Sequence, residues 1–245
     1  MNETTLSDVL TWTWRVWVGT WKIQLMIGGT YAALLALGAG SLMSGPGPLS
    51  IIGLLLLIAL VPTIPALPFI IAGMIAPDAG AVLRGQPAPF EVPWRRVPSI
   101  VVWSIGLTFV CSMLSYLFVF PAYFALSALW PWTMVLACEP QASAVARAQE
   151  LSDGFRLRFC WWHICATAIT GVPALIFLSA LTFATITPSG QEVAGGLFSN
   201  LLLTLAPLVF FLVFGSQASF LAALYQMIRR ERDMTNVEDL LNVFE

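Results

Sequence analysis

Charged residues are scarce in this chain. Asp, Glu, Lys and Arg make up 10% of its 245 residues, whereas hydrophobic residues make up 58%. An ordinary soluble domain has about 25% charged residues, and a soluble chain of this length has too little interior to hide so much apolar surface. The composition therefore indicates an integral membrane protein whose apolar segments meet lipid. The formal net charge of −2 also excludes a generally basic surface for nucleic acid.

Groups that carry chemistry are scarce as well. The sole histidine, His163, lies beside two tryptophans, and a lone histidine in that setting is most often a packing residue. The common hydrolase, zinc-protease and nucleotide-binding motifs do not occur in the sequence. The four cysteines, which lack a C-x-x-C pair and fit small buried residues better than a metal site, are Cys111, Cys138, Cys160 and Cys165. We therefore expect no enzyme activity, no catalytic residues, no metal and no cofactor.

Long apolar segments define the expected architecture. A helix of about 20 residues crosses the roughly 30 Å hydrocarbon core of a bilayer. We predict an all-α fold, a polytopic transmembrane helix bundle of about six spans that forms one membrane domain over residues 1–245. The stretch from Pro98 to Cys138 has 41 residues without a charge, so we place a hairpin there that turns near Phe120 and Pro121. The predicted spans are residues 24–43, 50–76, 98–119, 121–138, 159–183 and 198–225.

Residues 1–22 have an amphipathic pattern rich in tryptophan. Apolar and polar side chains separate onto two sides at helical spacing, and tryptophan favours the headgroup level of a membrane. We predict an interfacial helix here, and the alternative is an early start of the first span. The apolar side carries Leu10, Trp14, Trp17 and Trp21, and the polar side carries Ser7, Thr11, Arg15 and Lys22.

Three prolines interrupt the second predicted span. Pro62, Pro65 and Pro68 remove backbone donors, so we expect a kinked or locally unwound helix whose lost hydrogen bonds are supplied by neighbouring groups. One interpretation is a tolerated kink in a packed bundle, which the absence of an accompanying ionisable residue favours. The other is a discontinuous helix that lines a substrate site, as in some transporters.

Polar segments separate the spans. We predict a surface loop from Asp78 to Val97, a second interfacial helix that ends at Gly154, and a cytoplasmic tail over residues 229–245. Within the tail, Thr235 and Glu238 form a capping-box pattern that predicts a short helix.

With six spans, every basic residue lies on one side of the membrane. The positive-inside rule makes that side the cytoplasm, so we expect both termini there. The eleven residues are Arg15, Lys22, Arg84, Arg95, Arg96, Arg147, Arg156, Arg158, Arg229, Arg230 and Arg232.

Two groups of side chains are candidate contact sites. Arginines in the inner loops could hold lipid headgroups or a partner, and these are Arg84, Arg95, Arg96, Arg156 and Arg158. Within the spans, Gln217, Ser112 and Ser115 are a candidate polar cluster. Small residues around a glutamine more often make an interhelical hydrogen bond than line a pore, and both interpretations stay open.

The order of these parts is similar to that of a known family. It consists of a Trp-bearing lead-in, the pair Arg84-Gly85, Glu139-Pro140 followed by Leu151-Ser152 and Gly154, and Tyr225 before an arginine-rich end. It resembles the six-helix bacterial membrane family that includes the membrane domain attached to some glycerophosphodiester phosphodiesterases and its stand-alone relatives. The resemblance implies a multi-pass protein of a bacterial inner membrane. It implies no catalytic residues, because the phosphodiesterase chemistry belongs to a separate soluble domain.

Two functions fit these observations. The first is a non-catalytic scaffold or accessory subunit of a membrane complex, whose partners are the lipid bilayer and other membrane protein subunits, with no nucleic acid. The second is a transporter or lipid-handling component that has no ion-coupling residues of its own, because the predicted spans contain no Asp, Glu, Lys or Arg and His163 lies at the inner edge of the fifth.

Overall fold

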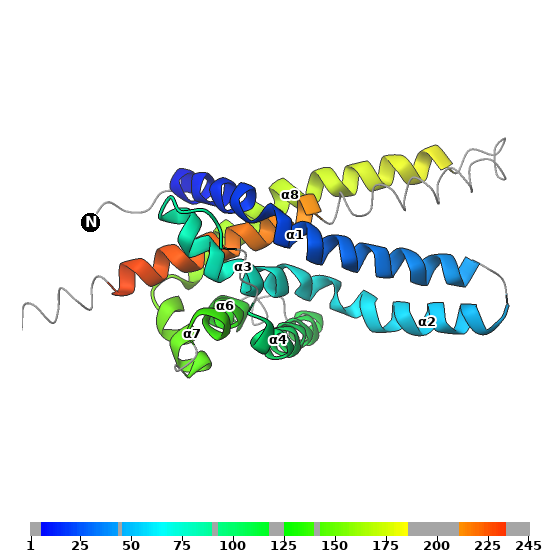
Figure 1. Ribbon diagram of the computed structural model, residues 1–245, viewed down its shortest axis with the longest axis horizontal. Helices are drawn as coiled ribbons and strands as arrows, with labels where there is room; N and C mark the ends of the chain where they lie inside the picture. The colour runs from blue at the N-terminus through cyan, green and yellow to red at the C-terminus, as the bar shows by residue number, and fades with distance from the viewer. Residues whose placement is uncertain are drawn as a thin grey trace, which may run out of the picture.

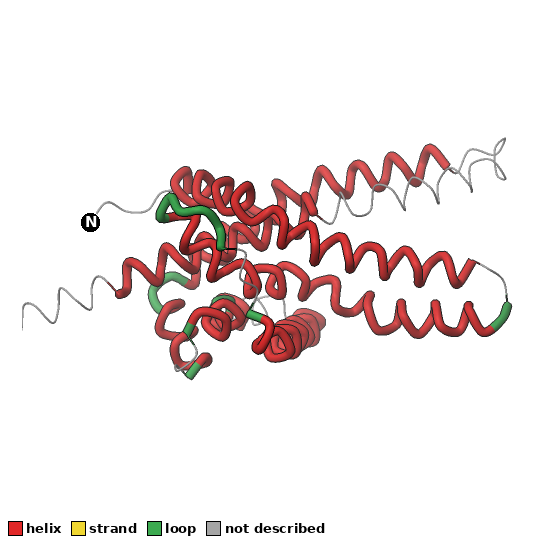
Figure 2. Tube along the Cα trace, in the orientation of Figure 1, coloured by secondary structure: helices red, strands yellow, loops and turns green. Residues whose placement is uncertain are grey.

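The computed structural model describes residues 6–43, 46–89, 93–117, 125–139, 143–185 and 211–233. Within these residues the chain is all-α, as predicted, and contains no strand (Figure 1, Figure 2). The helices are α1 (Leu6–Met43), α2 (Pro48–Leu60), the 3-10 helix η1 (Val61–Ala66), α3 (Leu67–Leu83), the 3-10 helix η2 (Trp94–Arg96), α4 (Val97–Leu117), α6 (Trp132–Cys138), α7 (Ala144–Ser152) and α8 (Arg156–Thr185). The described chain ends with a helix over Phe211–Asp233, which we name the last helix.

α1 is one continuous helix of 38 residues. The boundary expected near residue 22 is absent, so the predicted interfacial helix and the first span are parts of the same element. Its inward face carries Val9, Val16 and Ile23, each at most 1% exposed. The tryptophan side faces outward, with Trp14 61% and Trp21 45% exposed. An apolar stripe turned away from the protein is suited to contact with lipid.

α1 and α2 form a long antiparallel hairpin (Figure 1). The two helices touch at glycines, because a Cβ atom on Gly53 would lie 2.6 Å from the Gly38 carbonyl oxygen. Small residues that let helix backbones approach are typical of helix pairs in membranes. The rest of α2 faces outward, since Gly53 is its one buried residue and Leu55 is 62% exposed.

The predicted break in the second span is confirmed. The chain tightens into η1 between α2 and α3, where Pro62 and Pro65 supply no backbone donor. The Leu60 carbonyl at this break accepts hydrogen bonds from the Tyr31 hydroxyl of α1 and, at 2.7 Å, from the Thr63 hydroxyl. A neighbouring helix and a local side chain therefore hold the Leu60 carbonyl at this break.

α3 lies at the centre of the described fold. Almost all of its residues are buried, and it packs against α1, α4 and α6. The surface loop predicted from Asp78 begins later, because α3 continues to Leu83 and Asp78 is fully buried within it. The prediction that the helices lack buried ionisable groups is therefore wrong at this residue. α3 continues through Pro77, since a proline is tolerated inside a helix when neighbouring helices pack against it.

The hairpin predicted between residues 98 and 138 is described only in part. α4 covers the first half, while its predicted turn at Phe120 and Pro121 lies outside the described residues. The apolar segment Ala125–Cys138 is shorter than a span and contains a turn at Trp130 and Pro131. Figure 1 views α4 nearly along its axis, whereas α1 and α2 lie in the plane, so α4 crosses that hairpin steeply.

The next two helices follow the predicted pattern. α7 ends just before Gly154, whose backbone φ of +71° suits glycine, and α8 has 30 residues that include predicted span 159–183. Residues 234–245, with the predicted capping box, lie outside the described part of the chain.

Two of the described helices could cross a membrane by their length and composition. They are Ser7–Leu42, within α1, and Phe211–Asp233. Three further apolar helices of the described chain are shorter, and these are Pro48–Leu60, Leu67–Leu83 and Ala125–Cys138. The last helix packs into the core, where Ala218, Leu221 and Leu224 are fully buried.

Candidate functional site

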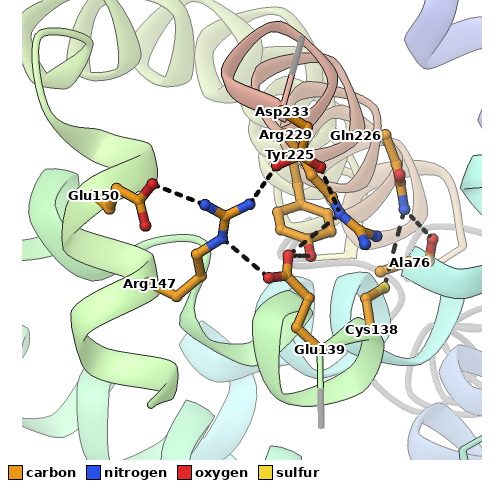
Figure 3. A network of polar contacts seen from close by, with 9 residues as sticks. All are labelled: Ala76, Cys138, Glu139, Arg147, Glu150, Tyr225, Gln226, Arg229 and Asp233. Carbon is orange, nitrogen blue, oxygen red and sulfur yellow. Dashed lines mark hydrogen bonds and ion pairs between the residues drawn. The ribbon is translucent and has the colours of Figure 1, made fainter. Parts of the chain in front are cut away.

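Glu139, at the C-terminal end of α6, has three polar partners from two other helices. Its Oε2 atom accepts a hydrogen bond from Arg147 Nε at 3.0 Å, and its Oε1 atom accepts one from the Tyr225 hydroxyl at 2.7 Å (Figure 3). Arg229 Nε forms an ion pair with Oε1 at 3.3 Å. Both carboxylate oxygens therefore have partners, drawn from α7 and from the last helix.

Arg147 joins three carboxylates. Besides Glu139, its guanidinium contacts Glu150 Oε1 at 2.9 Å through Nη1 and Asp233 Oδ1 at 2.7 Å through Nη2. Burial alone lowers the pKa of Arg147, but the hydrogen bonds to Asp233 and Glu150 and the charge of Glu139 together raise it above its ordinary value. Arg147 is therefore a permanent cation that ties α7 to both neighbouring segments.

The last helix supplies the other half of this cluster. Asp233 Oδ2 also lies 3.7 Å from Arg229 Nε, one helical turn earlier. Gln226 donates through Nε2 to the Ala76 carbonyl of α3 at 2.7 Å and lies 3.9 Å from Cys138 Sγ. We call this cluster the Glu139 network. Its six charged or phenolic members are Glu139, Arg147, Glu150, Tyr225, Arg229 and Asp233 (Figure 3).

Burial differs across the Glu139 network. The side chains of Glu139 and Arg147 are 14% and 15% exposed, whereas those of Glu150 and Asp233 are 50% exposed. Ion pairs to half-exposed partners are worth about 0–1 kcal/mol each. The Glu139–Arg147 pair is better shielded from water, so removal of either partner leaves a poorly solvated charge. The chemistry of the cluster is mutual neutralisation, which holds three segments in register.

Four of the predicted arginines lie outside the Glu139 network at this end of the molecule. Arg96 donates to the Leu136 carbonyl at 2.6 Å and to the Ala137 carbonyl at 3.2 Å, and so caps the end of α6. Arg95 is exposed in η2, Arg156 is half-buried at the start of α8, and Arg158 is exposed. The structure does not join these four into one site.

Arg84, the fifth predicted arginine, lies beside residues of the last helix. It lines a cavity of about 490 Å³ between the N-terminal part of α1 and the C-terminal ends of α3 and the last helix. The other residues around this cavity are Trp12, Gly80, Leu83, Gln226, Arg229, Arg230 and Asp233.

Gln217 makes the interhelical hydrogen bond expected of it. Its Nε2 atom donates to the Thr170 hydroxyl of α8 at 3.2 Å, and both residues line a mostly apolar cavity of about 270 Å³ between α1, α8 and the last helix. Ser112 and Ser115 belong to α4, but their side chains lie outside the described set. The predicted grouping of these serines with Gln217 therefore stays a prediction.

A second polar contact joins α1 to the last helix. Gln24, which is fully buried, donates through Nε2 to Ser219 Oγ at 2.8 Å and to Thr20 Oγ1 at 2.7 Å. Gly215 makes room for it, because a Cβ atom there would lie 2.5 Å from Gln24 Oε1. Sequence reasoning missed this contact, since Gln24 falls at the predicted start of a span.

The Glu139 network was also missed. The sequence shows polar residues next to the predicted spans, among them Glu139, Arg147, Glu150 and Tyr225. They are too far apart in the sequence for a local spacing to predict which of them are in contact. Within the described residues, no group of three or more His, Cys, Asp or Glu side chains is arranged to hold a metal ion.

Comparison with known proteins adds no relative. No family model, no curated protein and no solved structure matches this chain. The resemblance to the six-helix membrane family therefore stays a prediction from the sequence, and the function must be argued from the geometry.

Proposed function

We propose that this chain is a non-catalytic integral membrane protein that serves as a scaffold or accessory subunit of a membrane complex. The observation that carries the proposal is the closure of the Glu139 network on itself. Both Glu139 oxygens and all three guanidinium nitrogens of Arg147 bind other residues of the chain. Such a network maintains the shape of a surface, whereas an enzyme needs a group left ready to react.

The proposal includes six spans with both termini in the cytoplasm of a bacterium. Support comes from the eleven basic residues, which fall between the predicted spans on one side. Helix length also supports it, since the 30 residues of α8 extend about 45 Å. Outward-facing apolar residues such as Leu55, Ile58 and Phe109 are each about 60% exposed and fit contact with lipid.

Reporter fusions test this topology. A reporter that is active outside should be active after Gly47 and Ala122, and inactive after Gln86 and Gln149. The fusion at Ala122 decides whether α4 spans, because α4 crosses the α1–α2 hairpin steeply. Activity after Gln86 or Gln149, or its absence after Ala122, contradicts the six-span topology.

Purification in mild detergent tests the scaffold. The full chain should elute with a second membrane subunit in fixed ratio, and Arg147→Ala, which loosens the inner end, should release that subunit. The control Arg95→Ala changes an exposed arginine outside the Glu139 network and should retain it. A wild-type chain that elutes alone in each of two mild detergents contradicts the scaffold.

A lipid-handling role is the second candidate, and one cavity favours it. A mostly apolar space of about 560 Å³ lies beside the proline break, between α1, α3 and α4. Tyr31 and Thr63, whose hydroxyls donate to the Leu60 carbonyl at the break, are part of its wall. The test measures transfer of a fluorescent phospholipid between vesicles, with Gly40→Ala as the control chain. Transfer should be slower than this control in a chain with Pro62, Pro65 and Pro68 changed to alanine, and also in a Gln217→Ala chain. Folded variants that transfer the lipid at the wild-type rate contradict this role.

A further inference from the structure

The cavity beside Arg84, which we name the arginine pocket, is rich in positive charge. Its lining holds three arginines and one aspartate, contributed by α3 and the last helix. In the part of the chain that the structure describes, the guanidinium groups of Arg84 and Arg230 have no hydrogen-bond or ion-pair partner. Asp233, the one acidic residue of the lining, is already bound by Arg147 at 2.7 Å. Among the described residues, these two guanidiniums are therefore available to an anion.

The floor of the pocket is fixed by a close helix contact. A Cβ atom on Gly80 would lie 3.3 Å from the side chain of Gln226, which in turn donates to the Ala76 carbonyl of α3. Glycine at this point lets α3 and the last helix approach while space is left above it. Because the Gln226 amide is held by that bond, the pocket is formed before any ligand arrives.

Trp12 of α1 forms another wall of the arginine pocket. Its ring is packed against the hydrophobic core and is half-buried. Tryptophan favours the level of lipid headgroups, where one part of the ring is apolar and the N–H is wet. The pocket thus combines an aromatic wall with arginines, which bind phosphate oxygens through pairs of parallel N–H groups.

We propose that the arginine pocket binds a phosphate-bearing anion, held by Arg84 and Arg230 with Arg229 at its edge. The phosphate belongs either to the headgroup of an anionic lipid or to a small soluble compound. Only the lipid source rests on the proposed place of the chain in a bilayer. Arg95 and Arg96 do not line the pocket. Arg96 is instead hydrogen-bonded to the end of α6.

Binding of two probes to the full chain in detergent tests the pocket. Phosphatidylglycerol binding is measured by native mass spectrometry with phosphatidylcholine as the uncharged reference, and pyrophosphate binding by calorimetry. Arg84→Gln and Arg230→Gln should each weaken the binding of the preferred probe about fivefold, and the double variant about thirtyfold. Arg95→Gln is the matched control, since Arg95 is an exposed arginine at the same end of the molecule.

The pattern of losses identifies the source. Loss confined to phosphatidylglycerol supports a lipid headgroup, and loss confined to pyrophosphate supports a soluble phosphate compound. The pyrophosphate result does not depend on a bilayer, so failure of the membrane assignment is separable from failure of the pocket. The proposal is overturned if neither probe responds to the two pocket variants, or if Arg95→Gln weakens binding as much as they do.

Discussion

The hydroxyl of Tyr225 donates a hydrogen bond of 2.7 Å to Glu139 Oε1, across 86 residues of sequence. Tyr225 is 1% exposed and lies on the last helix, whereas Glu139 ends α6. The bond brings a neutral donor to a carboxylate that also binds two arginines. It therefore links the packed core of the protein to the charged Glu139 network.

Removal of this hydroxyl should destabilise the fold. We expect Tyr225→Phe to lower the free energy of unfolding by about 1.5 kcal/mol, since a hydrogen bond to a charged group contributes about that much. Thermal unfolding in detergent measures it. In a Glu139→Gln background the same change should cost clearly less, because the charged acceptor is gone. Equal losses in the two backgrounds would show that the bond is not the cause.

Arg147 should be irreplaceable by lysine. A lysine ammonium cannot direct three nitrogens at Glu139, Glu150 and Asp233 in one plane, so we expect Arg147→Lys and Arg147→Ala to lose similar stability, about 2–3 kcal/mol. The control Arg95→Lys should leave unfolding unchanged. Full stability of Arg147→Lys would mean that charge alone, without geometry, holds the network.

The contribution of Arg147 should persist at alkaline pH. Because its pKa is raised in the folded state, the stability it contributes is fully present below its ordinary pKa and is lost only as the pH rises through the folded value. The stability gap between wild type and Arg147→Ala should therefore be the same at pH 7 and pH 10. A gap that closes over this range contradicts the charged pairing.

A single methyl group added at Gly53 should destabilise the contact between α1 and α2. A Cβ atom on Gly53 would lie 2.6 Å from the Gly38 carbonyl oxygen and 2.8 Å from Ser41 Cβ, so Gly53→Ala should cost about 2 kcal/mol by overpacking. Gly40→Ala is the matched control in the same hairpin, since nothing lies within 4 Å of its added Cβ. We expect Gly40→Ala to raise helix stability by about 0.5 kcal/mol. Thermal unfolding that responds alike to both changes would argue against this contact.

The break at the prolines should depend on two hydroxyls together. Tyr31 and Thr63 both donate to the Leu60 carbonyl, so either single change, Tyr31→Phe or Thr63→Val, leaves one donor. The double variant removes both hydroxyl donors and should lose about 1 kcal/mol more than the two single losses combined, because neither hydroxyl is left to replace the other. Additive losses in thermal unfolding would mean that another donor replaces them.

Periodicity and turn residues allowed several elements to be predicted. The prolines at 62, 65 and 68 predicted the change of helix type at η1, and Gly154 predicted the end of α7, because each acts on its own backbone. The outward tryptophan side of α1 was also visible in the spacing of Trp14 and Trp21. The loop predicted from Asp78 was wrong at its start, because the burial of Asp78 in α3 depends on neighbouring helices that no local pattern shows.

The sequence by itself determined that this protein is helical and apolar, and where its helices are interrupted. Those properties are local, because helix periodicity, proline and composition act over a few residues. Only the tertiary structure decided that Glu139 meets Arg147 and Tyr225, and that Arg84 lies beside Arg230. Such pairings depend on how closely two helices approach. At three helix contacts a glycine, at position 53, 80 or 215, permits the close approach because it has no Cβ atom. No spacing along the chain encodes that distance, so the site became visible only in the folded protein.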